Sequence, residues 1–411
     1  MPNNNIIFQE QKRKAINFRV AVAQGNLEST QRYCDEYTLN SVDAKGNAAL
    51  HIACEKDEKE MLSFLLQQVQ IDIHKKNNEG KKPLELVKNL SVDFIKNIKV
   101  KSTIKDVIFL ETINAIVKQK IFFGAPNWQP ENFPEQKPTS ASLWKANDPN
   151  FYRIDVLQEV FLLIIEILKS KFEKDLNAFK LILLVIHASL AEAFQVGRCD
   201  EQVAVAFSQF LLSEEKINFE WFQARNPDKP GGQNFLVLNR NPQFLGCEAK
   251  PNEKPEAWQE GWVLDPMDSR VDKLNEITAA KLMGHLARIV SEPDSERIKL
   301  KHYIGMRLPL NVNHHEILIT KLGQVKQILN SLLEQSWDEV WNKINAVLHN
   351  EHSVSENLSC QIEGQAKVWI KAFFDILDTK IQAHQEIKAQ LAMHNEGLEA
   401  QMQNLFKKFR V

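Results

Sequence analysis

The sequence predicts an α+β fold that is mostly α-helical. Three observations support this prediction. The first 100 residues contain an internal repeat with an offset of 34 residues. In the middle of the chain, a cysteine at the start of an amphipathic helix precedes short strand-like runs. Residues 311–411 keep a helical pattern and contain no proline. These observations predict four segments, at residues 1–100, 101–150, 151–310 and 311–411.

Length and charge set the broad class of protein. A chain of 411 residues is long enough for two to four domains at roughly 150 residues each. The 51 lysines and arginines balance 53 aspartates and glutamates, so the composition indicates neither a nucleic-acid partner nor a membrane surface. The longest apolar stretches, at residues 160–168 and 181–190, are too short to cross a bilayer. We therefore expect no direct nucleic-acid binding and no membrane span.

The number and spacing of the cysteines, together with the N-terminal residues, indicate the cellular compartment in which the protein folds. The chain has five cysteines, an odd number without close pairing, which favours a reducing compartment over a disulfide framework. No C-x-x-C pair is present, so we expect no structural zinc and predict neither a metal nor a cofactor. The first residues, MPNNNIIFQEQKRK, lack the apolar core and cleavage site of a Sec-type signal peptide.

The internal repeat is typical of ankyrin units, which have a period of about 33 residues and a T-P-L-H-x-A signature. One copy supplies Leu50, His51 and Ala53 of that signature, and the next supplies Pro83 and Leu84. Because a single helix pair cannot bury its apolar face alone, about three such repeats are expected to stack before residue 100. We interpret His51 as a structural residue that bonds the neighbouring hairpin backbone.

The second hairpin of the repeat is a candidate binding site. Ankyrin stacks project their hairpins in a row from a rigid base. This hairpin is basic and could meet an acidic partner surface, although a merely solvated loop would have the same composition. The predicted partner-binding residues are Lys75, Lys76, Asn77, Asn78, Lys81 and Lys82.

The second segment, residues 101–150, is expected to be a helix followed by a proline-rich connection. Two apolar helices, at roughly 154–172 and 176–194, should then open the middle domain. After a break that contains glycine, Cys199 stands where the next helix should begin. Such a position favours a thiolate and lowers the thiol pKa, while the adjacent Asp200 and Glu201 partly oppose this effect.

The strand-like runs NFLVL and WVLDP follow this helix, and the order resembles that of papain-like cysteine proteases. In that family a histidine heads the first strand as the base, and an Asn or Asp on the next strand orients it. Asp265 fits the orienting role. The place of the histidine is taken by Asn234, whose amide cannot accept a proton. The candidate catalytic residues are therefore Cys199, Asn234 and Asp265, with activity left open.

Other histidines could still approach the thiol. His187 lies on a preceding apolar helix and is best interpreted as a core residue whose ring is hydrogen-bonded. The remaining candidates, whose distances from Cys199 the sequence leaves open, are His285, His302, His314 and His315.

The C-terminal segment is expected to form a long coiled-coil-like helix. Its apolar positions step by four and three residues, with polar residues such as His384, Lys388 and Asn395 at intervening seam positions. Polar seam residues favour a packing partner within the same chain over a long dimer, so we expect a monomer.

Repeats joined through a proline-rich connection to a GRCDEQ…NFLVL…LDP domain resemble the ankyrin-repeat effectors that Legionella species inject through a type IV secretion system. The resemblance implies translocation into the cytoplasm and nucleus of a host cell without a cleaved signal. It also implies a host protein as partner, with a nuclear La-related RNA-binding factor as the candidate. Two functions remain: an effector that binds a host protein, and a cysteine hydrolase or acyltransferase with Cys199 as nucleophile.

Overall fold

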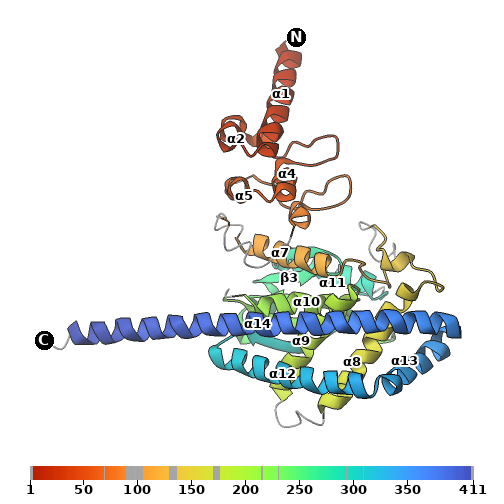
Figure 1. Cartoon of the computed structure of the whole chain (residues 1–411). Helices are drawn as coiled ribbons and strands as arrows, with labels where there is room; N and C mark the ends of the chain where they lie inside the picture. The colour runs from red at the N-terminus through yellow and green to blue at the C-terminus, as the bar shows by residue number, and fades with distance from the viewer. Residues whose placement is uncertain are drawn as a thin grey trace. The chain divides into compact units, whose positions relative to one another are not determined.

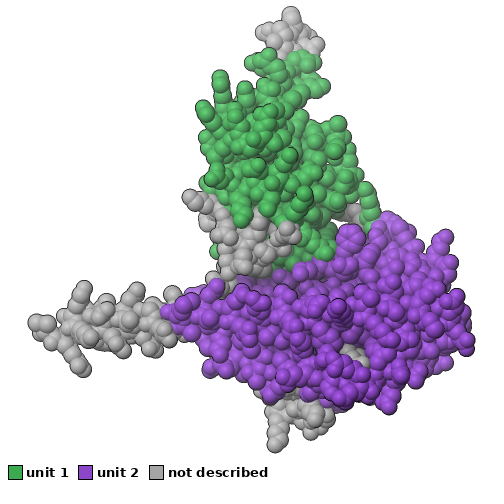
Figure 2. All heavy atoms as spheres, in the orientation of Figure 1, with its two compact units in different colours: residues 1–119, 135–137 green, residues 120–134, 138–411 purple. Residues whose placement is uncertain are grey.

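A computed structural model of the chain divides into two compact units (Figure 2). Unit 1 is Met1–Gln119 with Glu135–Lys137, and unit 2 is Lys120–Pro134 with Pro138–Val411. The structure describes residues 3–68, 70–88, 98, 105–128, 137–169, 176–213, 216–229, 231–292, 294–308 and 310–408. Side chains are not described for a few further residues within helices and strands, including 394–408.

Unit 1 is built from helices joined by extended hairpins (Figure 1). Its elements are α1 (Asn3–Ala23), α2 (Leu27–Tyr33), α3 (Glu36–Leu39), α4 (Ala49–Lys56), α5 (Lys59–Leu65), the 3₁₀ helix η1 (Pro83–Leu86) and most of α7 (Lys105–Lys120).

The 34-residue spacing is repeated in the hairpin backbone. In the first hairpin the Asp43 amide donates to the Asn47 carbonyl, and in the second the Asn77 amide donates to the Lys81 carbonyl, each at 3.0 Å. Gly46 and Gly80 close the two turns with φ angles of 78° and 80°. Because side chains rarely adopt this left-handed backbone, glycine is favoured in both copies. The two hairpins, 34 residues apart, therefore share the same turn geometry.

Unit 2 combines helices with one small antiparallel sheet (Figure 1). The strands are β1 (Asn218–Arg225), β2 (Gln233–Leu238), β3 (Trp262–Asp265), β4 (Arg270–Lys273) and β5 (Lys299–Arg307), in the order β4-β3-β2-β1-β5. The α-helices are α8 (Arg153–Lys169), α9 (Leu176–Phe194), α10 (Cys199–Leu211), α11 (Glu276–Ile289), α12 (Val312–Gln335), α13 (Trp337–His352) and α14 (Glu356–Lys408). Short 3₁₀ helices are η3 (Ala141–Leu143), η4 (Pro149–Tyr152), η5 (Pro242–Phe244) and η6 (Pro255–Trp258).

Helices cover both faces of the sheet. On one face Phe207 of α10 packs edge-on against Phe219 of β1, with ring centroids 4.6 Å apart. On the other face Phe235 and Val237 of β2 share a buried cluster with Leu286 of α11. Alternate residues of a strand point to opposite faces, so odd-numbered residues of β2 face α11 and even-numbered ones face α10.

Behind α10, helices α8, α9, α12 and α14 form a second layer. α9 packs against α10 and α8, and α14 packs against both α9 and α12 (Figure 1). Lys380 of α14 is buried and donates to Glu192 of α9 at 2.6 Å and to Ser208 of α10 at 2.8 Å. The predicted return of the C-terminal helix onto the body is confirmed as far as His384, whose side chain is also buried.

The protein is therefore mixed α+β and mostly helical, as the sequence predicts. The predicted segment boundaries need two corrections. Residues 105–119 belong with unit 1 rather than with a separate connecting segment, because Glu111 binds Lys82 within that unit. Residues 151–310 and 311–411 form one unit, because α14 packs on α9. In the described part of the chain, no helix has both the length and the apolar character needed to cross a membrane.

Candidate functional site

The predicted nucleophile Cys199 is the first residue of α10, as expected. The preceding residue, Arg198, has extended backbone, and its amide donates to the carboxylate of Glu201 at 2.8 Å. This contact satisfies a free amide at the helix start and fixes where the helix begins. Gly197 is required just before it, since a Cβ there would lie 2.6 Å from the Cβ of Glu201.

Cys199 lines a cleft of about 220 Å³ at the turn between β1 and β2. Its thiol donates to the carbonyl of Gly232 at 3.5 Å and accepts from the side-chain amide of Asn234 at 3.3 Å. Cys199 therefore lies in a cleft beside residues 231–234. Other residues that line the cleft include Asn127, Asn226, Lys229, Met267 and Ser291.

Asn234 occupies the position where a base would have to stand. Its Nδ2 donates to the Cys199 sulfur, and its Oδ1 accepts from Nε1 of Trp221 at 2.8 Å. All three residues lie on the α10 side of the sheet, and the two hydrogen bonds fix the orientation of the amide. An amide held in this way binds the thiol but cannot take its proton.

Asp265 does not join this pair, and its predicted orienting role is wrong. It lies on the opposite side of the sheet, where both carboxylate oxygens accept from Nε2 of Gln233 at 2.8–2.9 Å. Because adjacent strand residues alternate between faces, a carboxylate that contacts residue 233 cannot orient residue 234. Burial, with Asp268 nearby, raises the pKa of Asp265 to about 6. Asp268 in turn lies 2.8 Å from the His285 ring.

The expected lowering of the Cys199 pKa is also wrong. The thiol is buried, and burial raises its pKa to about 12, with the negative charge of Asp200 adding to the effect. The hydrogen bond from Asn234 acts in the opposite direction but is the weaker influence. Desolvation of the thiolate thus outweighs the favourable end of the helix dipole.

Cys199 should consequently react slowly with iodoacetamide near neutral pH. A pKa of about 12 leaves roughly one thiolate in 10⁵ thiols at pH 7, against a few per cent for an ordinary cysteine. Cys360, which is exposed, should be labelled at least about 100-fold faster. The measurement is time-resolved labelling of the intact protein followed by peptide mass spectrometry. Labelling of Cys199 as fast as that of Cys360 would contradict the assignment of a protonated thiol.

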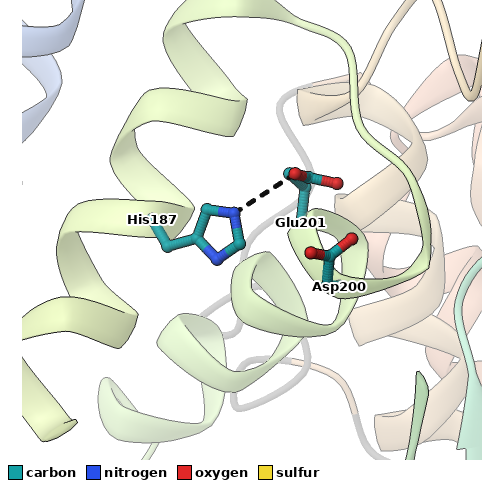
Figure 3. Close-up of side chains that lie close together, drawn as sticks. All are labelled: His187, Asp200 and Glu201. Carbon is teal, nitrogen blue, oxygen red and sulfur yellow. Dashed lines mark hydrogen bonds and ion pairs between the residues drawn. The ribbon is translucent and has the colours of Figure 1, made fainter. Parts of the chain in front are cut away.

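The histidines left open by the sequence are engaged elsewhere. His187 stacks on Phe161, with ring centroids 4.1 Å apart. Its Nε2 lies 3.3 Å from Glu201 (Figure 3), and both contacts confirm its interpretation as a core residue. The hydrogen-bond partners that the structure describes for Cys199 are Gly232 and Asn234, so no imidazole is among them. Contacts of the other histidines are His285 with Asp268, His302 with Glu220, His314 with Asn311, and His315 with His384.

In unit 1 the predicted binding residues divide into exposed and internal ones. Asn77 is buried and donates to the side chain of Asn47 at 2.9 Å, and Lys82 is buried against Glu111 at 2.8 Å. These two residues hold the hairpin in place and do not form part of a contact surface. Lys75 is half-buried and donates to the Asn40 carbonyl at 3.0 Å. The residues that remain exposed are Lys76, Asn78 and Lys81.

Two further residues of unit 1, His51 and Glu111, hold the second hairpin from inside. Nε2 of His51 lies 3.2 Å from the Lys81 carbonyl, and its Nδ1 accepts from the Ala48 amide at 3.1 Å, which confirms its predicted role. Sequence reasoning missed Glu111, which also lies 2.8 Å from His74. Its contact with Lys82 spans 29 residues, so no local pattern could have revealed it.

Comparison with known proteins gives one short similarity. A segment of 78 residues is 35% identical to oxysterol-binding protein homolog 2 of Saccharomyces cerevisiae. The segment is 19% of this chain and spans 6% of the length of that protein. No family model matches the chain, and no solved structure matches it. The similarity covers too little of either protein to define a family.

Proposed function

We propose that this protein binds another protein through the hairpin tips of unit 1, and that its cysteine centre is not a working hydrolase. In this proposal unit 1 is a short stack of ankyrin-type repeats, and unit 2 contains a degenerate papain-like core. The setting we propose is a host cell reached by type IV secretion, where the bound partner is a host protein such as a nuclear La-related factor. The support for this setting is the resemblance of the sequence to ankyrin-repeat effectors.

The main support for this proposal is that hydrogen bonds join the tips of the two hairpins into one continuous edge. The amide of Asn78 donates to the Lys45 carbonyl at 2.9 Å, and its side chain donates to the Ala44 carbonyl at 3.0 Å. The tips are therefore bonded to each other before any partner arrives, which limits the ordering that binding requires. We call the exposed residues of these tips the hairpin edge: Ala44, Lys45, Lys76, Asn78, Glu79 and Lys81.

The hairpin edge has net positive charge. Lys45 and Lys76 are exposed, and Lys81 lies 3.1 Å from Glu79, its one acidic neighbour on the edge. A basic edge of this kind favours an acidic protein surface and speeds the encounter with it. The internal residues below the edge, Asn77 and Lys82, keep the backbone rigid and leave the exposed lysines for the partner.

Charge reversal of the hairpin edge tests this function. The triple variant Lys45→Glu, Lys76→Glu, Lys81→Glu should lose at least about tenfold in partner affinity, because a few desolvated charges dominate such surfaces. Its melting temperature should stay close to that of the original protein, since all three side chains are exposed. Capture from host-cell extract, quantified by mass spectrometry, identifies the proteins whose retention depends on the edge.

The matched control reverses three lysines that are exposed in unit 1 away from the hairpins: Lys12, Lys56 and Lys59. This variant carries the same change in net charge and should keep the captured proteins. Equal losses in both triple variants would mean that net charge, rather than the hairpin edge, determines capture.

A cysteine hydrolase is the second candidate, because Cys199 does open into a cleft beside Gly231 and Gly232. A histidine at position 234 would be the simplest repair of that site. We expect Asn234→His to remain inactive on peptide and thioester probes. A catalytic imidazole must donate one ring N–H to an acceptor that orients it, whereas Trp221 at this position is itself a donor. Asp265, which could accept, lies on the other side of the sheet. Turnover by Asn234→His that is lost again in Asn234→His/Cys199→Ala would favour the hydrolase instead.

A further inference from the structure

Three metal-ligating side chains meet where α9 passes the first turn of α10 (Figure 3). They are His187 from α9, and Asp200 and Glu201 from α10. One ligand atom from each lies within 4.8 Å of the other two. The imidazole and the Glu201 side chain are nearly inaccessible, with exposures of 8% and 1%. One imidazole and two carboxylates are ligand types shared by zinc and by other first-row divalent metals.

The charge around Glu201 distinguishes it from the other buried glutamates of the described residues. Each of the other buried glutamates has a lysine or arginine within 4.0 Å: Glu111 has Lys82, Glu192 has Lys380, Glu220 has Arg240, and Glu292 has Arg297. For Glu201, by contrast, the ion-pair partner that the structure describes is His187 alone.

The excess of negative over positive charge in this cluster grows when Asp200 is included. A protonated His187 supplies at most one positive charge, and two adjacent carboxylates carry two negative ones. Close like charges are costly away from bulk water, and a cluster of this composition lowers that cost by taking up either a proton or a cation. A divalent ion supplies the missing charge and uses the same three side chains.

Neighbouring residues fix the orientation of His187 and Glu201 and leave lone pairs on these side chains for a metal ion. Phe161 stacks on the His187 ring at an interplanar angle of 10°, which fixes the plane of the imidazole. The Arg198 amide binds Oε2 of Glu201, and this leaves Oε1 directed at the ring. Contacts that orient ligands from behind are typical of metal sites. The contact between Nε2 and Oε1, at 3.3 Å, lies at the long end of the range for a hydrogen bond.

We propose that His187, Asp200 and Glu201 form a binding site for one divalent transition-metal ion, with zinc as the preferred ion. Three protein ligands leave a fourth position for water. The site is separate from the hairpin edge and does not depend on the proposed protein-binding function. No spacing motif marks it in the sequence, because the histidine precedes the carboxylates by 13 and 14 residues on another helix.

The test uses the full chain after treatment with EDTA and dialysis. Zinc titration should give one bound ion per chain and a rise in melting temperature, and cobalt should give visible d–d bands of a low-coordinate nitrogen and oxygen site. Asp200→Asn should weaken zinc binding by at least about tenfold, since loss of even an indirect contact has effects of that size. In EDTA this variant should melt at or above the temperature of the original protein, because it removes a like-charge contact.

The matched control is His74→Gln, which removes a histidine 2.8 Å from Glu111, a carboxylate already bound to Lys82. It should leave zinc affinity and the cobalt spectrum unchanged. His187→Gln should abolish both, and its melting temperature in EDTA reports whether the helices still pack. Equal zinc affinity of Asp200→Asn and the original protein, or binding without one-to-one stoichiometry, would overturn the proposal.

Discussion

Glu192→Ala is expected to destabilise unit 2 by about 3–5 kcal/mol, the range for breaking a buried ion pair from one side. Lys380 is only 7% exposed, and its ammonium contacts Glu192 at 2.6 Å and Ser208 at 2.8 Å. Loss of the carboxylate leaves this charge buried beside a hydroxyl that cannot neutralise it. Urea unfolding of the full chain, followed by tryptophan fluorescence, measures the change as a shift of the unit 2 transition.

Two controls separate the buried charge from other effects. The double variant Glu192→Leu/Lys380→Met removes both charges and should recover most of the lost stability. Asp378→Ala breaks an exposed pair with Lys326 that joins α12 to α14, and it should cost less than about 1 kcal/mol. A Glu192→Ala variant no less stable than Asp378→Ala would mean that the pair does not hold α14 in place.

Acidification is expected to weaken the packing of α14 on α12 through a buried histidine pair. His315 and His384 are each 1% exposed, and their Nδ1 atoms lie 3.0 Å apart. Burial lowers the pKa of His315 to about 4 and that of His384 to about 3, from an ordinary value of 6.5. Positive charge on His314 and Lys380 adds to these shifts.

Because the pKa values of both histidines are lower in the folded protein than in the unfolded chain, acid favours unfolding. Below pH 6.5 the unfolded chain binds protons at both histidines while the folded protein does not, so the free energy of unfolding falls as the pH falls toward 4. One histidine contributes up to about 1.4 kcal/mol per pH unit, so the loss between about pH 7 and about pH 5 should be at least about 2 kcal/mol.

The double variant His315→Met/His384→Met isolates this contribution, because all other titrating groups remain. Unfolding free energies at the two pH values should differ by at least about 2 kcal/mol less in the variant than in the original protein. An unchanged pH dependence would show that the pair does not control acid stability.

Helices were predicted well from the sequence because their apolar residues recur at every turn. The observed α9 has the predicted bounds, and α10 begins at Cys199 as predicted. Strand β1, which lies between β2 and β5 in the sheet, was missed. Glu220 stands in the middle of β1, and a charged residue there argues against a buried strand. In the folded protein Arg240 neutralises Glu220 through two hydrogen bonds of 2.7–2.8 Å, and the sequence does not show that Arg240 lies beside β1.

The candidate site was predictable only in part, for a similar reason. The order of elements places Cys199 near Asn234, and the structure brings them together. The side of the sheet on which Asp265 lies depends on strand register, and a one-residue difference transfers a side chain to the other face. Burial also reversed the expected shift in the Cys199 pKa, because the depth of the thiol cannot be judged from its position in a helix. Tertiary placement therefore determines what this cysteine can do.

Capture of the partner by two variants of the full chain tests whether the hairpin edge, rather than Cys199, binds the partner. We expect Cys199→Ala to retain the captured host protein, because the thiol is bound to Asn234 and takes no part in binding. We expect Lys45→Glu/Lys76→Glu/Lys81→Glu to lose that protein while keeping its melting temperature. The opposite pattern, with capture lost in Cys199→Ala and retained after charge reversal of the hairpin edge, would mean that the cysteine centre binds the partner and the hairpin edge does not.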